Sequence, residues 1–325
     1  NNQEKYYEFL SVCSHEFFHT WNVKRLRPKG ITPYNFTKEN YIEELWISEG
    51  TTSYYQDLML LKAGIGNEDT FLKNLENNVQ NDIRRPGNRV QSLAESSFDA
   101  WVKLWVNTPN KFDAESNYYD KGSNVSLLLD LEIRNNTGNK YSLDNVMRAM
   151  YERYPLEKGG FTNADFIKVS GEFAGEDLSK FFESYLYGTD TLDWNKYLLY
   201  AGLQLNKTIN QIKPAIGINT RNQGDRLIIN YVVPGLPAYE TGLETGDEII
   251  ALNGYKVNSS SLTDRISDMN DGDTVTLTVM RNEILRQFEI PIKNITTYTY
   301  KITKVEDSNP LQKSIYENWL STSWK

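Results

Sequence analysis

The chain has 325 residues, 39% of them hydrophobic and 13% aromatic, which is enough to bury the cores of about two domains. Its net charge of -8 argues against nucleic acid as a main partner, and its single tight basic cluster, Lys24 to Arg27, is more typical of a solvated helix end. The sequence predicts no transmembrane segment, no signal peptide and, with one cysteine, no internal disulfide. The compartment stays open between cytoplasm and periplasm.

The first segment with recognisable chemistry runs from His15 to His19 and reads His-Glu-Phe-Phe-His; it holds both histidines of the chain. Residues four apart lie one turn above each other on a helix, so His15 and His19 can hold one metal ion while Glu16 projects beside them. A catalytic zinc takes three protein ligands and a water, and a neighbouring carboxylate accepts the proton of that water. Apolar residues before and through the motif predict a buried helix with Pro28 as its limit.

Only 14 residues precede His15, which leaves no room for the sheet that usually lines one side of the cleft in zinc peptidases. We therefore expect that the catalytic domain has a further part upstream of residue 1. After Pro28, residues 28–40 are typical of a loop, and residues 41–63 predict a second helix that Gly64 caps.

A third metal ligand must be a carboxylate. The chain has no third histidine, so the site is not of the three-histidine type, which would require histidine where Arg25 stands. Cys13 lies two residues from His15 and therefore on nearly the opposite side of the helix. Spacing alone does not choose among the nearby candidates, which are Glu43, Glu44, Glu49 and Asp57.

Residues 67–117 predict helices and polar loops with a break at 84–87. Trp101, Leu104 and Trp105 fit one apolar helix face, and we expect them in the core rather than in contact with substrate. Residues 140–204 predict the closing helices of the same domain, among them 144–151 and a helix that begins near Asp177 and ends near Gly188. We assign no chemistry to them.

The segment from Tyr118 to Asn124 leads into an apolar helical run. Attack of water on a peptide carbonyl creates an oxyanion, and a hydrogen-bond donor aimed at it is worth about a hundredfold to a thousandfold in rate. A tyrosine hydroxyl is a suitable donor, although most of the 21 tyrosines must be packing or surface residues.

The pattern changes after about Asn206 to short β-rich runs that alternate with turns, and Asn253-Gly254 is a hairpin signal. We expect a β-rich domain at 207–298. The tail at 299–325 predicts a short helix that contains Ile315, Trp319 and Leu320 and docks back onto one of the domains. The expected strands are 226–233, 248–252, 274–280 and 286–292.

Several strings resemble known families. The segment from Trp46 to Gly50 resembles the Trp-x-x-Glu-Gly segment of gluzincin aminopeptidases, whose glutamate binds zinc, and this implies Glu49 as the third ligand. Tyr-x-Lys-Gly at 119–122 resembles the gluzincin segment whose tyrosine stabilises the oxyanion, which implies Tyr119. The longer string from His15 to Pro28 resembles the glycyl aminopeptidase family, whose members join a gluzincin domain to a C-terminal PDZ domain.

The resemblance implies an α+β multidomain chain, in which a mainly α-helical, thermolysin-like catalytic domain at 1–206 precedes the PDZ domain. The string from Val233 to Gly254 resembles bacterial protease-associated PDZ domains. Such domains can add an extended peptide to a sheet edge, here at Ile216, Gly217 and Ile218, although a packing or gating role is equally open. One departure is Ser53, where many related peptidases have an aspartate that orients the histidines.

The resemblance implies an aminopeptidase with one Zn²⁺ per chain that acts on peptides or proteins and releases small N-terminal residues, especially glycine. Glu16 would be the general base and Tyr119 the oxyanion donor. A gluzincin endopeptidase is an alternative. A second alternative is a non-catalytic PDZ peptide-binding protein with a structural metal, but a structural zinc has four protein ligands and needs no Glu16.

Overall fold

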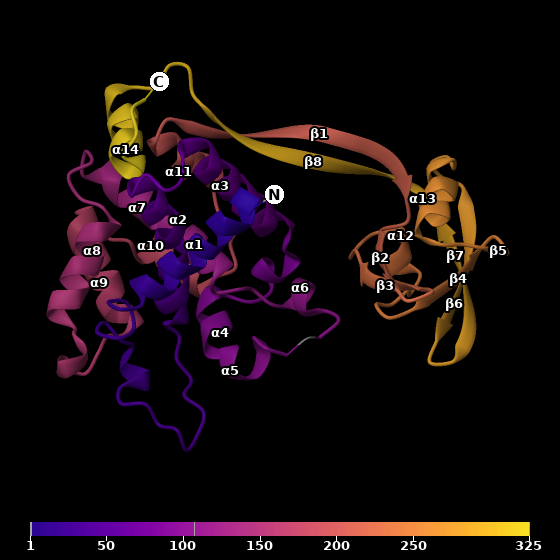
Figure 1. The fold of residues 1–325 in the computed structure, drawn as a ribbon, viewed down its shortest axis with the longest axis horizontal. Helices are drawn as coiled ribbons and strands as arrows, with labels where there is room; N and C mark the ends of the chain where they lie inside the picture. Colours follow the sequence, from indigo (N-terminus) through magenta and orange to yellow (C-terminus); the bar gives the residue numbers. More distant parts are fainter. Residues whose placement is uncertain (1, 107, 325) are drawn as a thin grey trace. The chain divides into compact units, whose positions relative to one another are not determined.

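The computed structural model describes residues 2–106 and 108–324, which divide into two compact units (Figure 1). The first unit contains the residues up to 206 together with those from 300 onward, and the second contains Lys207–Thr299. The predicted α+β class is confirmed, since the first unit is helical and the second is β-rich. In the described part of the chain, no helix has both the length and the apolar character to cross a membrane.

The first unit consists of helices packed around one apolar core. Its longer helices are α1 (Asn2–Phe18), α2 (Thr52–Lys62), α3 (Glu68–Arg84), α7 (Asp120–Asn136), α8 (Leu143–Arg153), α9 (Asn163–Ala174) and α14 (Pro310–Leu320). Its shorter ones are α4 (Leu93–Phe98), α5 (Ala100–Lys103), α6 (Lys111–Ala114), α10 (Ser179–Phe182) and α11 (Trp194–Tyr200). The remaining turns are η1 (Lys29–Ile31), η2 (Trp46–Thr51), η3 (Pro86–Arg89), η4 (Leu156–Lys158) and η5 (Glu183–Tyr187).

Helix α7 contacts α2, α3, α8, α9, α11 and α14 and is therefore central to the packing of this unit. Its residues from Lys121 to Arg134 are buried almost without interruption, as expected for a helix that is covered on all sides. Its first turn packs against η2 through two glycines. A Cβ atom on Gly50 would lie 2.6 Å from the Cα atom of Gly122, so this close approach of two helix backbones requires glycine.

Two helix boundaries differ from the prediction. α1 ends at Phe18 rather than near Pro28, because residues 19–26 fold into consecutive hydrogen-bonded turns in which Val23 has a φ of 101°. The second helix begins near Leu45 rather than at residue 41, and its first turn is the π-helix η2. Gly64 follows it with a φ of 72°, in agreement with the predicted cap.

The interpretation of the tryptophans near residue 100 was wrong. Trp101 is 59% exposed and Trp105 is 87% exposed, whereas Leu104 packs partly against the core. Helix α5 is only four residues long and turns only part of its apolar face toward the core.

The second unit is built on a sheet with the strand order β2-β3-β4-β6-β7, in which β5 pairs with β4. The turn at Asn253-Gly254 connects β4 to β5, and both residues have positive φ, which confirms the hairpin. The elements are β2 (Ile218–Gln223), β3 (Arg226–Val232), α12 (Pro237–Glu240), β4 (Glu248–Leu252), β5 (Tyr255–Lys256), α13 (Ser259–Ser267), β6 (Thr274–Arg281) and β7 (Ile284–Pro291).

The chain enters this unit through β1 (Leu203–Ala215) and leaves it through β8 (Lys293–Lys304), and the two strands pair with each other. The tail after β8 returns to the first unit, where α14 buries Ile315, Trp319 and Leu320 in the core of that unit. The helical unit is therefore completed by residues that follow the β-rich unit in the sequence.

Candidate active site

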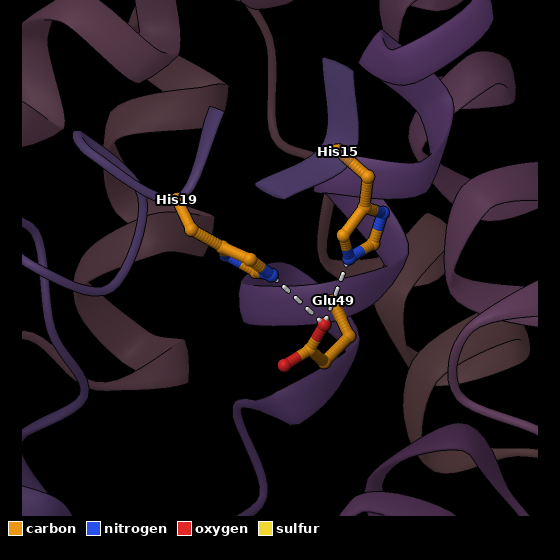
Figure 2. A group of neighbouring side chains, drawn as sticks. All are labelled: His15, His19 and Glu49. Carbon is orange, nitrogen blue, oxygen red and sulfur yellow. Dashed lines mark hydrogen bonds and ion pairs between the residues drawn. The ribbon is translucent and has the colours of Figure 1, made fainter. Parts of the chain in front are cut away.

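His15, His19 and Glu49 meet in the helical unit (Figure 2). His15 lies in the last turn of α1, His19 directly follows this helix, and Glu49 comes from η2. The Nε2 atoms of both histidines lie 3.2 Å from Glu49 Oε2, and the possible ligand atoms of the three residues all lie within 4.8 Å of one another. Among residues 2–106 and 108–324, no other three histidine, cysteine, aspartate or glutamate residues bring their possible ligand atoms this close together.

The three donor atoms fit a zinc ion. Zinc binds imidazole nitrogen and carboxylate oxygen at about 2.0–2.2 Å in a tetrahedral arrangement, so two of its ligand atoms lie about 3.3 Å apart. The two separations of 3.2 Å from Glu49 Oε2 match this value. Three protein ligands would leave one position of the tetrahedron for water, as in catalytic rather than structural zinc sites.

Buried Asn22 connects the two segments that carry these residues. Its backbone oxygen lies 3.0 Å from His19 Nδ1, which indicates that Nδ1 donates and leaves Nε2 to face Glu49. Its side-chain amide donates to the carbonyl oxygens of Ile47 and Ser48 at 2.8 and 3.2 Å, within the π-helical turn. Asn22 therefore orients His19 and holds the turn that carries Glu49.

The electrostatics of the three residues depend on each other. Burial alone would raise the pKa of Glu49, but its hydrogen bonds to His15 and His19 outweigh burial and lower that pKa to about 2. Burial would lower the pKa of His19, but the contacts with Glu49 and with the backbone of Asn22 outweigh it and raise this pKa. Glu49 is therefore ionised at neutral pH, as a metal ligand must be.

The other carboxylates that spacing allowed lie elsewhere. Glu43 is exposed, and Glu44 accepts a hydrogen bond from the backbone of Asn163 at 3.2 Å. Asp57 accepts from the hydroxyl of Ser11 at 2.6 Å. The geometry thus selects Glu49, in agreement with the resemblance, while its role as a ligand stays a prediction.

Sequence reasoning missed the residue that orients His15. Gln56 Oε1 lies 2.9 Å from His15 Nδ1, whereas the hydroxyl of Ser53, which occupies the position of the expected aspartate, lies at 3.5 Å. Gln56 follows Glu49 by seven residues, about two helical turns, and therefore lies on the same face. That spacing was a signal in the sequence that could have identified it.

The two predicted catalytic residues lie beside this group. Glu16 is exposed, and its charge contributes to the raised pKa of His19. Tyr119 directly precedes the first turn of α7, and its ring stacks on that of His15 with centroids 6.2 Å apart. Burial, reinforced by the charge of Glu49, raises the pKa of Tyr119 to about 12, so its hydroxyl keeps the proton that an oxyanion donor needs.

The predicted peptide edge of the second unit lies at the start of β2, an edge strand that pairs with β3. Ile216 is buried, and its carbonyl oxygen accepts from the backbone of Ala238 at 2.8 Å. Gly217 has a φ of 88°, and a Cβ atom there would lie 2.5 Å from the Cβ atom of Leu236. Ile218 begins the strand. Peptide binding at this edge stays a prediction.

Comparison with known proteins places the two units. A family model described as M61 glycyl aminopeptidase matches residues 8–125, and a PDZ-domain model matches residues 214–292. The crystal structure of an aminopeptidase N family protein from Idiomarina loihiensis is similar over 98% of this chain, with 30% identity and a TM-score of 0.86. The match covers 55% of that protein, so this chain spans about half of its length.

A probable periplasmic serine endoprotease, DegP-like, from Bartonella henselae is 28% identical over 120 residues, which are 37% of this chain and 21% of that protein. The matched models and the fold define a peptidase domain joined to a PDZ domain. More particularly, residues 8–125 are similar to the M61 glycyl aminopeptidases, and the PDZ domain lies on their C-terminal side, in agreement with the resemblance found in the sequence.

Proposed function

We propose that this chain is the catalytic part of a zinc-dependent aminopeptidase that releases small N-terminal residues such as glycine from peptides or proteins. The observation that carries the proposal is the convergence of His15, His19 and Glu49 at separations that suit one zinc ion, with Glu16 on the same helix. Three ligands and an adjacent carboxylate support a catalytic rather than a structural metal. The glycyl aminopeptidase model supports the preference for glycine.

A zinc ion at this position would supply Lewis acidity, which acidifies a water and polarises the scissile carbonyl. The residues of the chain carry the proton transfers. Glu16 accepts the proton of the attacking water and passes it to the leaving amine. The hydroxyl of Tyr119 donates a hydrogen bond to the oxygen on which negative charge develops. Asn22 holds the imidazole of His19, and Gln56 holds that of His15, each through the Nδ1 atom of the histidine.

The experiment combines metal analysis with a panel of fluorogenic substrates. The panel contains glycyl, alanyl, leucyl and phenylalanyl amides, their N-acetylated counterparts and an internally quenched peptide. We expect one zinc per chain and fastest release of glycine from the free-amine substrates. Turnover of the acetylated or internally quenched peptides in place of the free-amine substrates would instead favour an endopeptidase.

The matched variant is Glu16→Gln, which keeps the size of the side chain and removes its basicity. It should retain one zinc per chain and lose turnover by at least about a hundredfold, since a positioned general base contributes about 10²–10⁴. Unchanged turnover with zinc bound would refute the mechanism.

A further inference from the structure

A chain of hydrogen bonds leads away from the ring nitrogen of His15 that does not face Glu49. His15 Nδ1 lies 2.9 Å from Gln56 Oε1, and Gln56 Nε2 lies 2.9 Å from the hydroxyl oxygen of Ser11. Ser11 in turn lies 2.6 Å from Asp57 Oδ1. Ser11 and His15 are 7% and 9% exposed, so little water can replace these contacts. These hydrogen bonds join α1 to α2 behind the three ligand candidates.

The carboxylate at the end sets the direction of every hydrogen bond in this chain. A carboxylate oxygen accepts, so the hydroxyl of Ser11 donates its single hydrogen to Asp57. The oxygen of Ser11 must then accept from Gln56, which turns the amide nitrogen of Gln56 toward Ser11 and its carbonyl oxygen toward His15. That oxygen can only accept, so His15 Nδ1 carries a hydrogen, and in the neutral imidazole that binds a metal the lone pair is then on Nε2.

The reversed amide would be unfavourable at both ends. It would place the oxygen of Gln56 against the oxygen of Ser11, whose hydrogen is already directed at Asp57. It would also place an N–H group against His15 Nδ1, which favours the tautomer with hydrogen on Nε2 and so blocks the atom that faces Glu49. Asp57 is held by a second hydrogen bond from Asn74 at 3.1 Å.

We propose that Asp57, Ser11 and Gln56 are positioning residues that hold His15 in the tautomer whose Nε2 atom can bind zinc; this inference rests on the proposed zinc function. Asp57 thereby acts from behind His15 rather than as a ligand. The imidazole of His15 is held by the neutral amide of Gln56 rather than by the carboxylate of an aspartate. Removal of a hydrogen bond to the ring of a metal-binding histidine typically weakens metal binding by about 10- to 100-fold.

The test measures the zinc dissociation constant of the whole chain by competition with a chelator. Gln56→Met keeps the length of the side chain and removes the acceptor, and we expect zinc to bind about 10- to 100-fold more weakly. Gln56→Glu restores an acceptor for Nδ1 but directs a second oxygen at the oxygen of Ser11, so it should bind zinc more tightly than Gln56→Met. The control is Gln80→Met, the same change at a half-buried position of α3, which should leave zinc affinity unchanged.

A second readout separates tautomer control from general loosening of the site. The protein has two histidines, so selective ¹⁵N labelling gives two imidazole N–H signals in the zinc-loaded protein, one from each Nδ1. In Gln56→Met we expect the Nδ1 hydrogen of His15 to exchange faster with water, while that of His19, bonded to the backbone of Asn22, keeps its rate. A purely structural loss would accelerate both.

If Gln56→Met binds zinc as tightly as the wild type, the inference is refuted while the proposed function stands. If the wild-type chain binds no zinc, the proposed function fails and the inference fails with it. If Gln56→Met does not fold, Ser11→Ala can replace it. This variant removes the hydrogen-bonding group between Gln56 and Asp57 and should also weaken zinc binding.

Discussion

Replacement of Trp319 by alanine should destabilise the helical unit, although this residue follows the whole PDZ domain in the sequence. Trp319 lies in α14, is fully buried and packs edge-to-face on Phe71 with ring centroids 5.7 Å apart. Its indole N–H donates to the hydroxyl of Tyr54 at 3.0 Å, and that hydroxyl donates to Asp130 at 2.7 Å. Tyr54 belongs to α2, the helix that continues from the turn of Glu49.

Truncation of a buried tryptophan to alanine costs about 3–5 kcal/mol. For a unit of this size, about 1 kcal/mol corresponds to about 2–4 °C in the midpoint of thermal unfolding. A loss of about 4 kcal/mol therefore predicts a fall of about 8–16 °C. Differential scanning calorimetry of the metal-free chain measures it without the contribution of bound zinc.

The matched control is Trp105→Ala, the same substitution at a side chain that is 87% exposed. It should change the free energy of unfolding by no more than about 0.5 kcal/mol, because surface substitutions away from special contacts have small effects. Equal shifts for Trp319→Ala and Trp105→Ala would refute the conclusion that α14 is part of the core of the helical unit.

Three further predictions concern the site. Tyr119→Phe should retain zinc and lower turnover about a hundredfold to a thousandfold, because one oxyanion donor is lost; unchanged turnover in substrate assays would leave Tyr119 a packing residue. Glu49→Gln should weaken zinc binding in the chelator assay, whereas Glu44→Gln, which keeps an acceptor for the backbone of Asn163, should not; equal affinities would contradict the ligand assignment. Gly50→Ala should lower the unfolding midpoint and weaken zinc binding, because the new Cβ atom would lie 2.6 Å from the backbone of Gly122 and force η2 and α7 apart. If this variant keeps the unfolding midpoint and the zinc affinity of the wild type, the backbones of Gly50 and Gly122 do not pack tightly enough to require glycine.

The sequence by itself determined the local features of this protein, in the site and outside it. The spacing of His15 and His19 is a property of one helix turn, so their meeting needed no information from the rest of the chain. The hairpin at Asn253-Gly254 and the cap at Gly64 are equally local, because positive φ is a property of the residue and its neighbours. A family resemblance added Glu49, which spacing left undecided among four carboxylates.

Tertiary structure decided which residues surround those local parts. Periodicity predicts that a segment has an apolar face but does not state whether anything covers it, which is why Trp101 and Trp105 were wrongly expected in the core. Gln56 orients His15, and Trp319 packs into the helical unit, through contacts 41 residues and more apart in sequence. Such contacts depend on how helices pack, and helix packing is set by the shape of many side chains together rather than by any one motif.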